Sequence, residues 1–203
     1  MNRLDPPPRG AILAGGGATR LGGAAKGLLA VGGRRILDRL VAAFEEAMGH
    51  LPLLVANAPE APTWHRGLRV VGDRVRGAGT LGGLLTAVLE APAPVVCVAW
   101  DMPFVPAGLI RALADGLDGA DACLPASGGR RGVEPLCAAY GPACAEPMAD
   151  AIKQGDLRAI GFHGAIRVHL LPEPDVRRHG SPEQLFFNVN TAEELARANG
   201  MVS

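Results

Sequence analysis

The sequence predicts an α/β domain in which a mostly parallel sheet lies between two layers of helices. Three observations predict it: apolar runs of strand length alternate with segments of helical periodicity, a glycine-rich loop follows the first apolar run, and an aspartate follows the most apolar run. The chain has 203 residues, a length that one α/β domain commonly reaches. We therefore expect a single domain over residues 10–203, preceded by a flexible, proline-containing leader at residues 1–9.

Apolar periodicity assigns the elements of the first half. Between residues 36 and 44 apolar side chains recur at the three- and four-residue spacing of a helix, and Gly49 ends that pattern. Continuous apolar runs indicate strands that are buried on both faces of the sheet. The predicted elements are strands at 11–13, 51–56, 68–71 and 94–99, a helix from 36 up to Gly49, and a helix from 81 towards 90 that Thr80 caps.

The second half is less regular. Helical spacing predicts a helix at residues 109–117, and apolar runs predict strands at 135–140 and 166–171. A last extended segment, at residues 186–189, leads into a final helix. Thr191 and Glu194 have the spacing of a capping box, which is a structural feature that starts this helix.

The loop after the first strand has the composition of a polyphosphate cradle. Gly15, Gly16 and Gly17 let the backbone turn tightly and approach a ligand closely. Arg20 can form paired hydrogen bonds with phosphate oxygens, and Lys26 adds a compact positive charge. A triphosphate fits this combination.

Two better-known glycine loops do not fit the spacing. A dinucleotide fingerprint needs glycine at the position of Arg20, and a Walker-type loop needs Ser or Thr after its Gly-Lys pair, whereas Lys26 lies between Ala25 and Gly27. The alternative that remains open is a flexible strand-to-helix connection with two solvated cations.

Asp101 comes after the apolar strand at residues 94–99, with only Trp100 between them. Met102-Pro103 then turns the chain away from the strand direction. In doubly wound sheets ligands bind beyond the carboxyl ends of the strands, so this carboxylate is expected at the same rim as the glycine loop. Mg²⁺ commonly takes one or two protein carboxylates together with phosphate oxygens and water. Asp101 is therefore a candidate magnesium ligand; the alternative is an aspartate that caps the following turn.

A third candidate feature is a pair of asparagines near the end of the chain. If residues 186–190 are extended, Asn188 and Asn190 point to one face, where their carboxamides can contact phosphate, metal-bound water or ribose. The alternative is that each is only a turn residue.

Composition excludes several classes of function. The formal net charge is +0 and aromatic residues make up 4%, which argues against a nucleic-acid-binding surface. No apolar run reaches the length of a membrane span and no signal segment is evident, so we expect a cytoplasmic protein that does not bind membranes. The four cysteines lack metal-ligand spacing and are expected to be buried thiols, and no histidine is needed as a base.

Five stretches of the chain, in order, resemble those of molybdenum cofactor guanylyltransferases. They are residues 13–16 with Arg20, Gly22 and Lys26; Asp73 with residues 79–84; residues 101–103; residues 134–140; and residues 188–191. The resemblance spans nearly the whole chain, although Leu21, Thr80 and Trp100 depart from the family pattern. It implies a Rossmann-like nucleotidyltransferase domain of the GT-A-like type.

The activity that the resemblance implies is transfer of GMP from GTP to the terminal phosphate of molybdenum-molybdopterin, with Mg²⁺ as cofactor and release of pyrophosphate. Arg20, Lys26 and Asp101 are the implied catalytic residues, with Asp101 on the metal. The implied nucleotide contacts are Leu13, Ala14, Gly15, Gly16, Lys26, Asn57, Asp73 and Asp101. The second glycine after Ala14, and Glu134 before Pro135, favour GTP over CTP.

The acceptor side is defined less sharply. Arg130 and Arg131, in a glycine turn, are candidate contacts for the anionic pterin substrate, and solvated arginines are the alternative. The resemblance also implies transient contacts with molybdenum cofactor enzymes or their chaperones. Two other functions stay open: a nucleotidyltransferase with CTP or with a sugar or cobinamide phosphate acceptor, and a non-catalytic nucleotide-binding partner.

Overall fold

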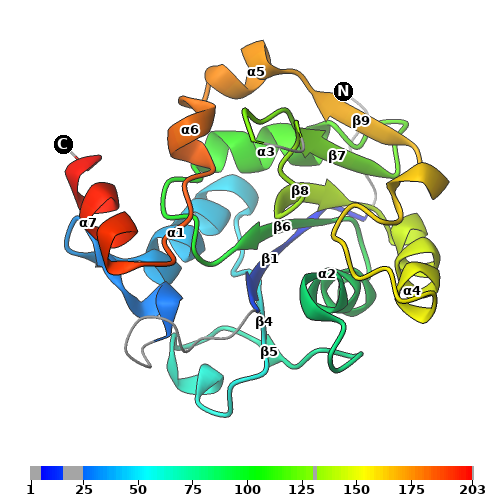
Figure 1. Ribbon diagram of the computed structural model, residues 1–203, viewed down its shortest axis with the longest axis horizontal. Helices are drawn as coiled ribbons and strands as arrows, with labels where there is room; N and C mark the ends of the chain where they lie inside the picture. Colours follow the sequence, from blue (N-terminus) through cyan, green and yellow to red (C-terminus); the bar gives the residue numbers. More distant parts are fainter. Residues whose placement is uncertain (1–5, 16–24, 130–131, 203) are drawn as a thin grey trace.

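A computed structural model describes residues 6–15, 25–129 and 132–202 of the chain. Within these residues a seven-stranded sheet has the strand order β5-β4-β1-β6-β8-β7-β9. Six strands run parallel and β8 runs antiparallel to both of its neighbours, as the predicted mostly parallel sheet requires (Figure 1). The strands are β1 (Arg9–Ala14), β4 (Leu53–Ala56), β5 (Val70–Val71), β6 (Val95–Ala99), β7 (Ala122–Pro125), β8 (Cys137–Tyr140) and β9 (Val168–Leu171).

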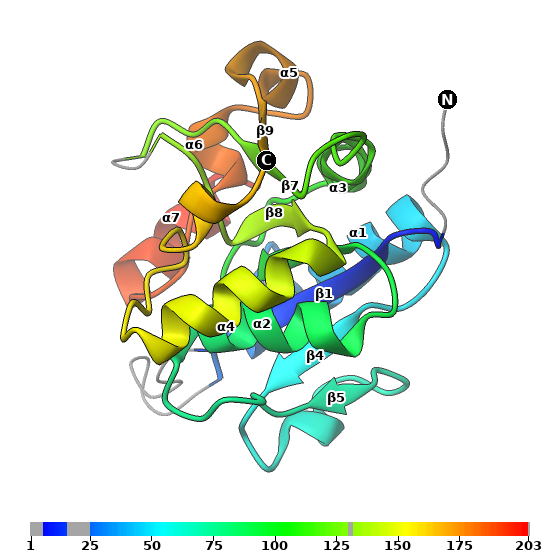
Figure 2. The ribbon, with the colours of Figure 1, turned by 90° about the vertical axis from the view of Figure 1, so that its right-hand side faces the viewer.

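Helices cover both faces of this sheet. They are α1 (Ile36–Met48), α2 (Gly79–Glu90), α3 (Ala107–Asp115), α4 (Ala145–Lys153), α5 (Glu173–Arg177), α6 (Pro182–Leu185) and α7 (Ala192–Gly200). Figures 1 and 2 show α2 and α4 side by side on one face and α1 and α3 on the other. The predicted three-layer α/β/α arrangement is confirmed.

Strand alternation explains why two helical layers are needed. In β1, Ile12 packs into the core under α1 and α3, whereas Ala11 and Leu13 pack into the core under α2. In β6, Val96 and Val98 face the first core, and Val95 and Cys97 face the second. A sheet that is apolar on both faces must be covered on both.

Smaller elements connect these layers. A short hairpin of β2 (Ala30–Val31) and β3 (Arg34–Arg35) precedes α1, and a 3-10 turn, η1 (Lys26–Leu28), precedes the hairpin. Further 3-10 turns lie at Ala61–Thr63, Pro142–Cys144 and His163–Ala165. No helix among the described residues combines the length and apolar character of a membrane span.

Several predicted boundaries match the structure closely. The helix predicted up to Gly49 is α1, and Gly49 ends it with a left-handed backbone (φ 75°) while its N–H donates to the Glu45 carbonyl at 2.8 Å. The predicted capping box is also present: the Thr191 hydroxyl accepts from the Glu194 amide, and the Glu194 carboxylate accepts from the Thr191 amide.

Other boundaries are wrong, for local reasons. Arg9 is not part of a leader but the first residue of β1, because its N–H donates to the Pro94 carbonyl at 2.8 Å and extends the ladder towards β6. Thr80 does not cap α2: the chain enters that helix through Gly77 and Gly79, both with positive φ, so Thr80 already lies inside the first turn.

The strand predicted at residues 186–189 does not form. Phe186 ends α6 in a turn conformation, and the segment that follows is irregular. A single backbone bond, from the Val189 N–H to the Asp101 carbonyl at 2.9 Å, ties it to the end of β6. Two further elements, β7 and α4, were not predicted; they have only four and nine residues.

Candidate active site

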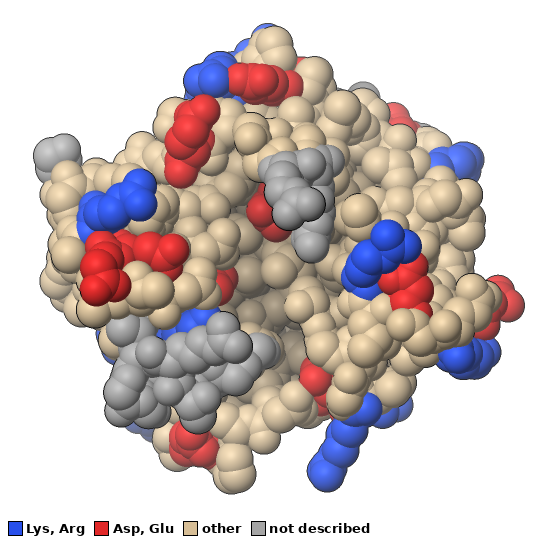
Figure 3. All heavy atoms as spheres, in the orientation of Figure 1, with Lys and Arg blue, Asp and Glu red and all other residues tan. Residues whose placement is uncertain are grey.

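Two hollows are candidates for a ligand site. The larger, of about 680 Å³, opens beyond the carboxyl ends of β1, β4 and β6 and is called the carboxyl-end pocket here. It is lined by Leu13, Ala14, Gly15, Lys26, Val55, Asn57, Ala58, Trp64, Asp73, Gly77, Gly79, Thr80, Gly83, Ala99, Trp100, Asp101 and Leu136. Figure 3 shows the surface hollowed at the centre of the molecule, where Figure 1 places β1 and β4.

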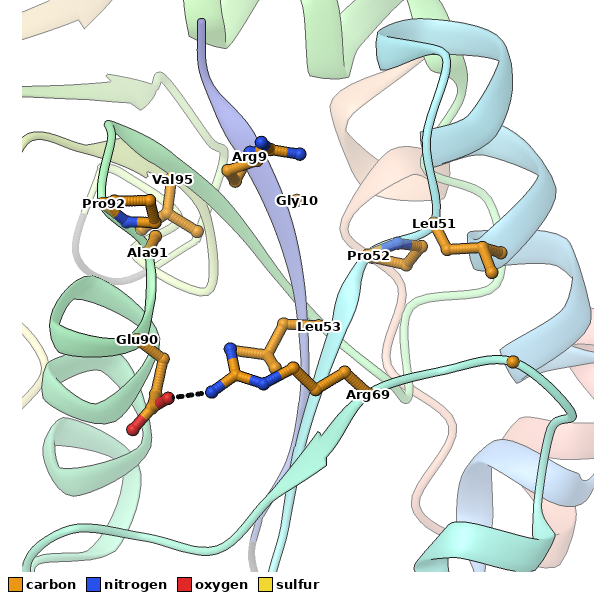
Figure 4. A pocket seen from close by; sticks show the side chains of 11 residues that line it. Arg9, Gly10, Leu51, Pro52, Leu53, Arg69, Glu90, Ala91, Pro92 and Val95 are labelled. Carbon is orange, nitrogen blue, oxygen red and sulfur yellow. Dashed lines mark hydrogen bonds and ion pairs between the residues drawn. The ribbon is translucent and has the colours of Figure 1, made fainter. Parts of the chain in front are cut away.

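The smaller hollow, of about 270 Å³, lies at the opposite ends of the same strands. An ion pair between Arg69 and Glu90 crosses it, and Arg9 lies on its far side (Figure 4). The sheet changes direction of winding between β1 and β6, since β4 and β5 follow on one side of β1 and β6 pairs on the other. Ligands of such sheets bind at the carboxyl side of that reversal, which selects the carboxyl-end pocket.

The end of β1 forms one wall of the pocket. Leu13 pairs with both neighbouring strands and Ala14 pairs with β4, so the sheet fixes the backbone at the start of this wall. Apart from the chain neighbours of Gly15, no described atom lies within 4 Å of the position that a Cβ would take there. The predicted residues Gly16 and Arg20 lie outside the described residues, as do Arg130 and Arg131.

Lys26 and Asp101 meet at the rim of the pocket. Lys26 begins η1, and its Nζ lies 4.0 Å from Oδ2 of Asp101; the two side chains are only 13% and 18% exposed. Lys26 also donates a hydrogen bond of 2.5 Å to Oδ1 of Asn190. Among the described residues, the buried Oδ1 of Asp101 has no hydrogen-bond partner.

Burial raises the pKa of Asp101 above its ordinary value. The positive charge of Lys26 opposes this shift, and the negative charge of Glu194 adds to it. A buried carboxylate with an unpartnered oxygen is electrostatically unfavourable unless a cation approaches it. No group of three metal-ligating side chains occurs among the described residues, and Mg²⁺ needs only one or two. The environment of Asp101 therefore fits a Mg²⁺ ligand.

Asn57 and Asp73 form a second polar pair on the wall of the pocket. The Asn57 amide donates to Oδ2 of Asp73 at 2.6 Å, and the Asp73 backbone N–H donates to Oδ1 of Asn57 at 2.8 Å. These reciprocal bonds join the loop after β4 to the loop after β5. Asn57 and Asp73, both predicted to contact the nucleotide, therefore lie side by side at the pocket. Asn57 holds the Asp73 carboxylate in place.

The two asparagines near the C-terminus have different partners. Asn190 contacts Lys26, and its backbone N–H donates to the Glu194 carboxylate at 2.7 Å. Asn188 instead donates to the Phe186 carbonyl at 3.0 Å, within its own turn. The two side chains do not share a face as predicted, because the segment is not a strand. The capping box, by contrast, has an electrostatic effect as well as a structural one, since Glu194 acts on Asp101.

Trp64 and Trp100 form an aromatic wall of the pocket that was not predicted from the sequence. The rings of Trp64 and Trp100 are stacked, with centroids 5.1 Å apart and planes at 25°. The one available signal was that Trp100 directly precedes Asp101. Trp64 lies far from any motif, and only the tertiary structure places it on Trp100.

The remaining reactive side chains lie elsewhere. All four cysteines are free and buried, as predicted, and burial raises the pKa of Cys123 and Cys144 to about 12. Such thiols are unreactive at neutral pH. No histidine is among the residues that line the carboxyl-end pocket.

Comparisons with known proteins identify the family of the chain. The sequence pattern of the MobA-like NTP transferase domain matches residues 10–166. A probable molybdenum cofactor guanylyltransferase of Pelotomaculum thermopropionicum is 32% identical, covering 95% of this chain and 92% of the relative. A molybdenum cofactor guanylyltransferase of Cereibacter sphaeroides is 36% identical, covering 95% and 96%.

Solved structures show the same fold. Molybdopterin-guanine dinucleotide biosynthesis protein A from Archaeoglobus fulgidus is similar with a TM-score of 0.78 and 25% identity, covering 95% of this chain and 97% of that one. A cytidylyltransferase from Thermus thermophilus, acting on 2-C-methyl-D-erythritol 4-phosphate, shares the fold at 20% identity and a TM-score of 0.66. The match over most of the chain and the relatives above 30% identity establish that the protein is a nucleotidyltransferase of the MobA-like NTP transferase family.

Proposed function

We propose that the protein transfers GMP from GTP to the terminal phosphate of molybdopterin carrying molybdenum, with Mg²⁺ and with release of pyrophosphate. The observation that carries this proposal is the pairing of Lys26 with the buried Asp101 at the rim of the carboxyl-end pocket. The names of the relatives, molybdenum cofactor guanylyltransferase, support the donor and the acceptor.

The proposed reaction needs no side-chain nucleophile. An oxygen of the acceptor phosphate attacks the α-phosphorus of GTP, the new O–P bond forms, and the bond to the β-phosphate oxygen breaks. The attacking oxygen is already an anion, so no proton has to be removed by a base. Positioning and charge neutralisation supply the acceleration, which agrees with a pocket that contains no histidine.

Each residue has a defined part in this proposal. Lys26 offsets the negative charge of the phosphates, and Arg20 steadies the leaving pyrophosphate. Asp101 would hold the Mg²⁺, whose positive charge would offset the repulsion between the two anions. Because Asn190 bonds Lys26, it keeps that ammonium beside Asp101.

The base is held in the other half of the pocket. The backbone of Leu13, Ala14 and Gly15 lies against it, Gly16 is a further proposed contact, and Asp73 offers carboxylate oxygens to donor groups of the nucleoside. Small residues on that wall, among them Gly79 and Gly83, leave room for a purine. Arg130 and Arg131 remain the proposed contacts of the anionic pterin.

The test compares donors and acceptors directly. Purified protein is incubated with Mg²⁺, each of GTP and CTP, and molybdenum-molybdopterin, a sugar phosphate or cobinamide phosphate, while pyrophosphate release and the product mass are measured. We expect turnover with GTP and molybdopterin. Faster turnover with CTP contradicts the base, turnover only with another acceptor contradicts the acceptor, and GTP binding without any turnover identifies a non-catalytic partner.

A further inference from the structure

Trp100 contacts both ends of the glycine-rich segment. Its backbone N–H donates to the Leu13 carbonyl at 3.2 Å, where the segment begins. Its indole packs on Gly27, where the segment ends: a Cβ at Gly27 would lie 2.4 Å from Cε3 of Trp100 and 3.0 Å from Cδ2. The next residue along the chain is Asp101. Trp100 thus contacts the residue that follows Lys26 and itself precedes Asp101.

The indole of Trp100 is fixed in this place. It is 2% exposed, and Trp64 stacks on it. Trp64 is held in turn, because its carbonyl accepts a 2.9 Å hydrogen bond from Arg35, whose guanidinium makes two 2.7 Å bonds to Asp38. A large ring packed this tightly cannot shift without moving its neighbours.

We propose that Trp100 is a positioning residue that sets the separation of Lys26 and Asp101 by supporting the turn at Gly27. This inference rests on the proposed function for its catalytic consequence. Lys26 directly precedes Gly27 and Asp101 directly follows Trp100, so any displacement of the indole relative to Gly27 changes the 4.0 Å between Nζ and Oδ2. A smaller side chain at position 100 allows the turn to move into the vacated space. A larger residue at position 27 displaces the turn away from the indole.

The close contact allows a test by exchange of volume. The backbone of Gly27 is not left-handed, and the three nearest described atoms to a Cβ there all belong to the indole, so the cost of Gly27→Ala is assigned to that contact. Trp100→Leu opens that space. We expect each single variant to weaken Mg²⁺–GTP binding by about tenfold, since a misplacement of 1 Å at a site costs this much or more. In the double variant, the new methyl group fills part of the opened space, and binding is expected to be tighter than in Gly27→Ala.

Two matched controls separate positioning from stability. Gly164→Ala adds the same methyl group at a glycine that no described atom crowds, outside the pocket. Phe162→Leu removes a ring of the core that packs near Tyr140, also outside the pocket. Both controls are expected to bind Mg²⁺–GTP as the wild type does, although Phe162→Leu lowers the melting temperature. Trp100→Phe, which keeps an aromatic ring, is expected to recover most of the affinity lost in Trp100→Leu.

The readouts distinguish this inference from the proposed function. Binding is measured by calorimetry with Mg²⁺–GTP and with Mg²⁺–triphosphate, and turnover with molybdopterin is measured separately. A wild type that binds but does not turn over contradicts the proposed function alone. Single variants that bind normally, or a double variant whose losses simply add, overturn the positioning role. A wild type that binds neither probe overturns both.

Discussion

Lys26 and Asp101 place an ammonium and a carboxylate 4.0 Å apart at the end of the two central strands, with the second oxygen of the carboxylate buried and unpartnered among the described residues. Lys26 is in contact with Asn190, whereas Asp101 is tied to the same C-terminal segment through the Val189 backbone. The site is therefore assembled from three distant parts of the chain. Each part can be tested separately.

Replacement of Asp101 tests the metal assignment. We expect Asp101→Ala to lower Mg²⁺-dependent turnover about 100-fold or more while the protein stays folded, because the cation loses its carboxylate. The measurement is turnover against Mg²⁺ concentration, with circular dichroism as the check of folding. Asp101→Asn, which keeps the shape, should lose activity to a similar extent. Normal activity in either variant contradicts the metal assignment.

Replacement of Lys26 tests the phosphate contact. We expect Lys26→Ala to weaken GTP binding by about tenfold or more, because a charge-assisted contact with phosphate is lost. Lys153→Ala is the matched control: Lys153 is exposed and pairs only locally with Asp150. Calorimetric titration with GTP compares the two variants, and equal affinities are the result that removes Lys26 from the site.

The pH dependence follows from the raised pKa of Asp101. The ionised carboxylate is the form that pairs with Lys26 and holds a cation, so kcat/KM is expected to fall on acidification through a limb above the ordinary carboxyl value of 3.8. The contribution of Asp101 to the free energy of unfolding has the opposite dependence on pH. The folded protein binds the Asp101 proton more tightly than the unfolded chain, so this contribution is present at low pH and is lost as pH rises from 3.8 through the raised pKa.

Two measurements check these signs. The first is the pH profile of kcat/KM, in which the limb attributed to Asp101 should be absent from the residual activity of Asp101→Asn. The second is the free energy of unfolding measured against pH. Asp101→Asn should lack the decrease in this free energy that Asp101 causes as the pH rises. If the variant keeps both features unchanged, another group is responsible.

The two asparagines are expected to behave differently. Asn190→Ala frees the Lys26 ammonium and should lower kcat/KM for GTP, because the lysine loses its hydrogen-bond acceptor. Asn188→Ala removes only a bond within a turn, so we expect normal kinetics and a loss of about 1 kcal/mol of stability. The measurements are kcat/KM from steady-state kinetics and the melting temperature from thermal unfolding, for both variants. Similar kinetics in the two variants contradict the distinction.

The aromatic wall offers an optical signal. The chain contains two tryptophans, Trp64 and Trp100, and both line the carboxyl-end pocket. Nucleotide binding is therefore expected to change the intrinsic fluorescence, and in Trp64→Phe the remaining signal comes from Trp100 alone. Titration of that variant with Mg²⁺–GTP should give a saturable change. If the fluorescence changes in neither the variant nor the wild type, the ligand does not approach this wall.

Local sequence patterns account well for the central elements. The helix that ends at Gly49 and the strand before Trp100 are long, strongly patterned segments, and the capping box at Thr191 depends on residues three positions apart. Helix and strand periodicity are local properties, so one window of sequence contains the whole signal. The motifs at Leu13 and Asp101 likewise lie at the ends of apolar strands.

Features that depend on distant contacts could not be derived in this way. The segment before Thr191 alternates like a strand, yet it is irregular and is tied to the end of β6 by the Val189 backbone. For the same reason the different roles of Asn188 and Asn190 were not visible. The short strand β7 forms because β8 and β9 flank it, although its own four residues carry little signal.

The sequence by itself determined the α/β class, the order of most elements and the strand ends at which Asp101, Asn57 and the glycine loop lie, because these follow from the pattern of neighbouring residues. Only the tertiary structure decided which side chains meet. The pairing of Lys26 with Asp101 and Asn190, and the stacking of Trp64 on Trp100, join residues whose separation along the chain gives no local pattern. Such contacts form because packing both faces of the sheet brings these segments together at one rim.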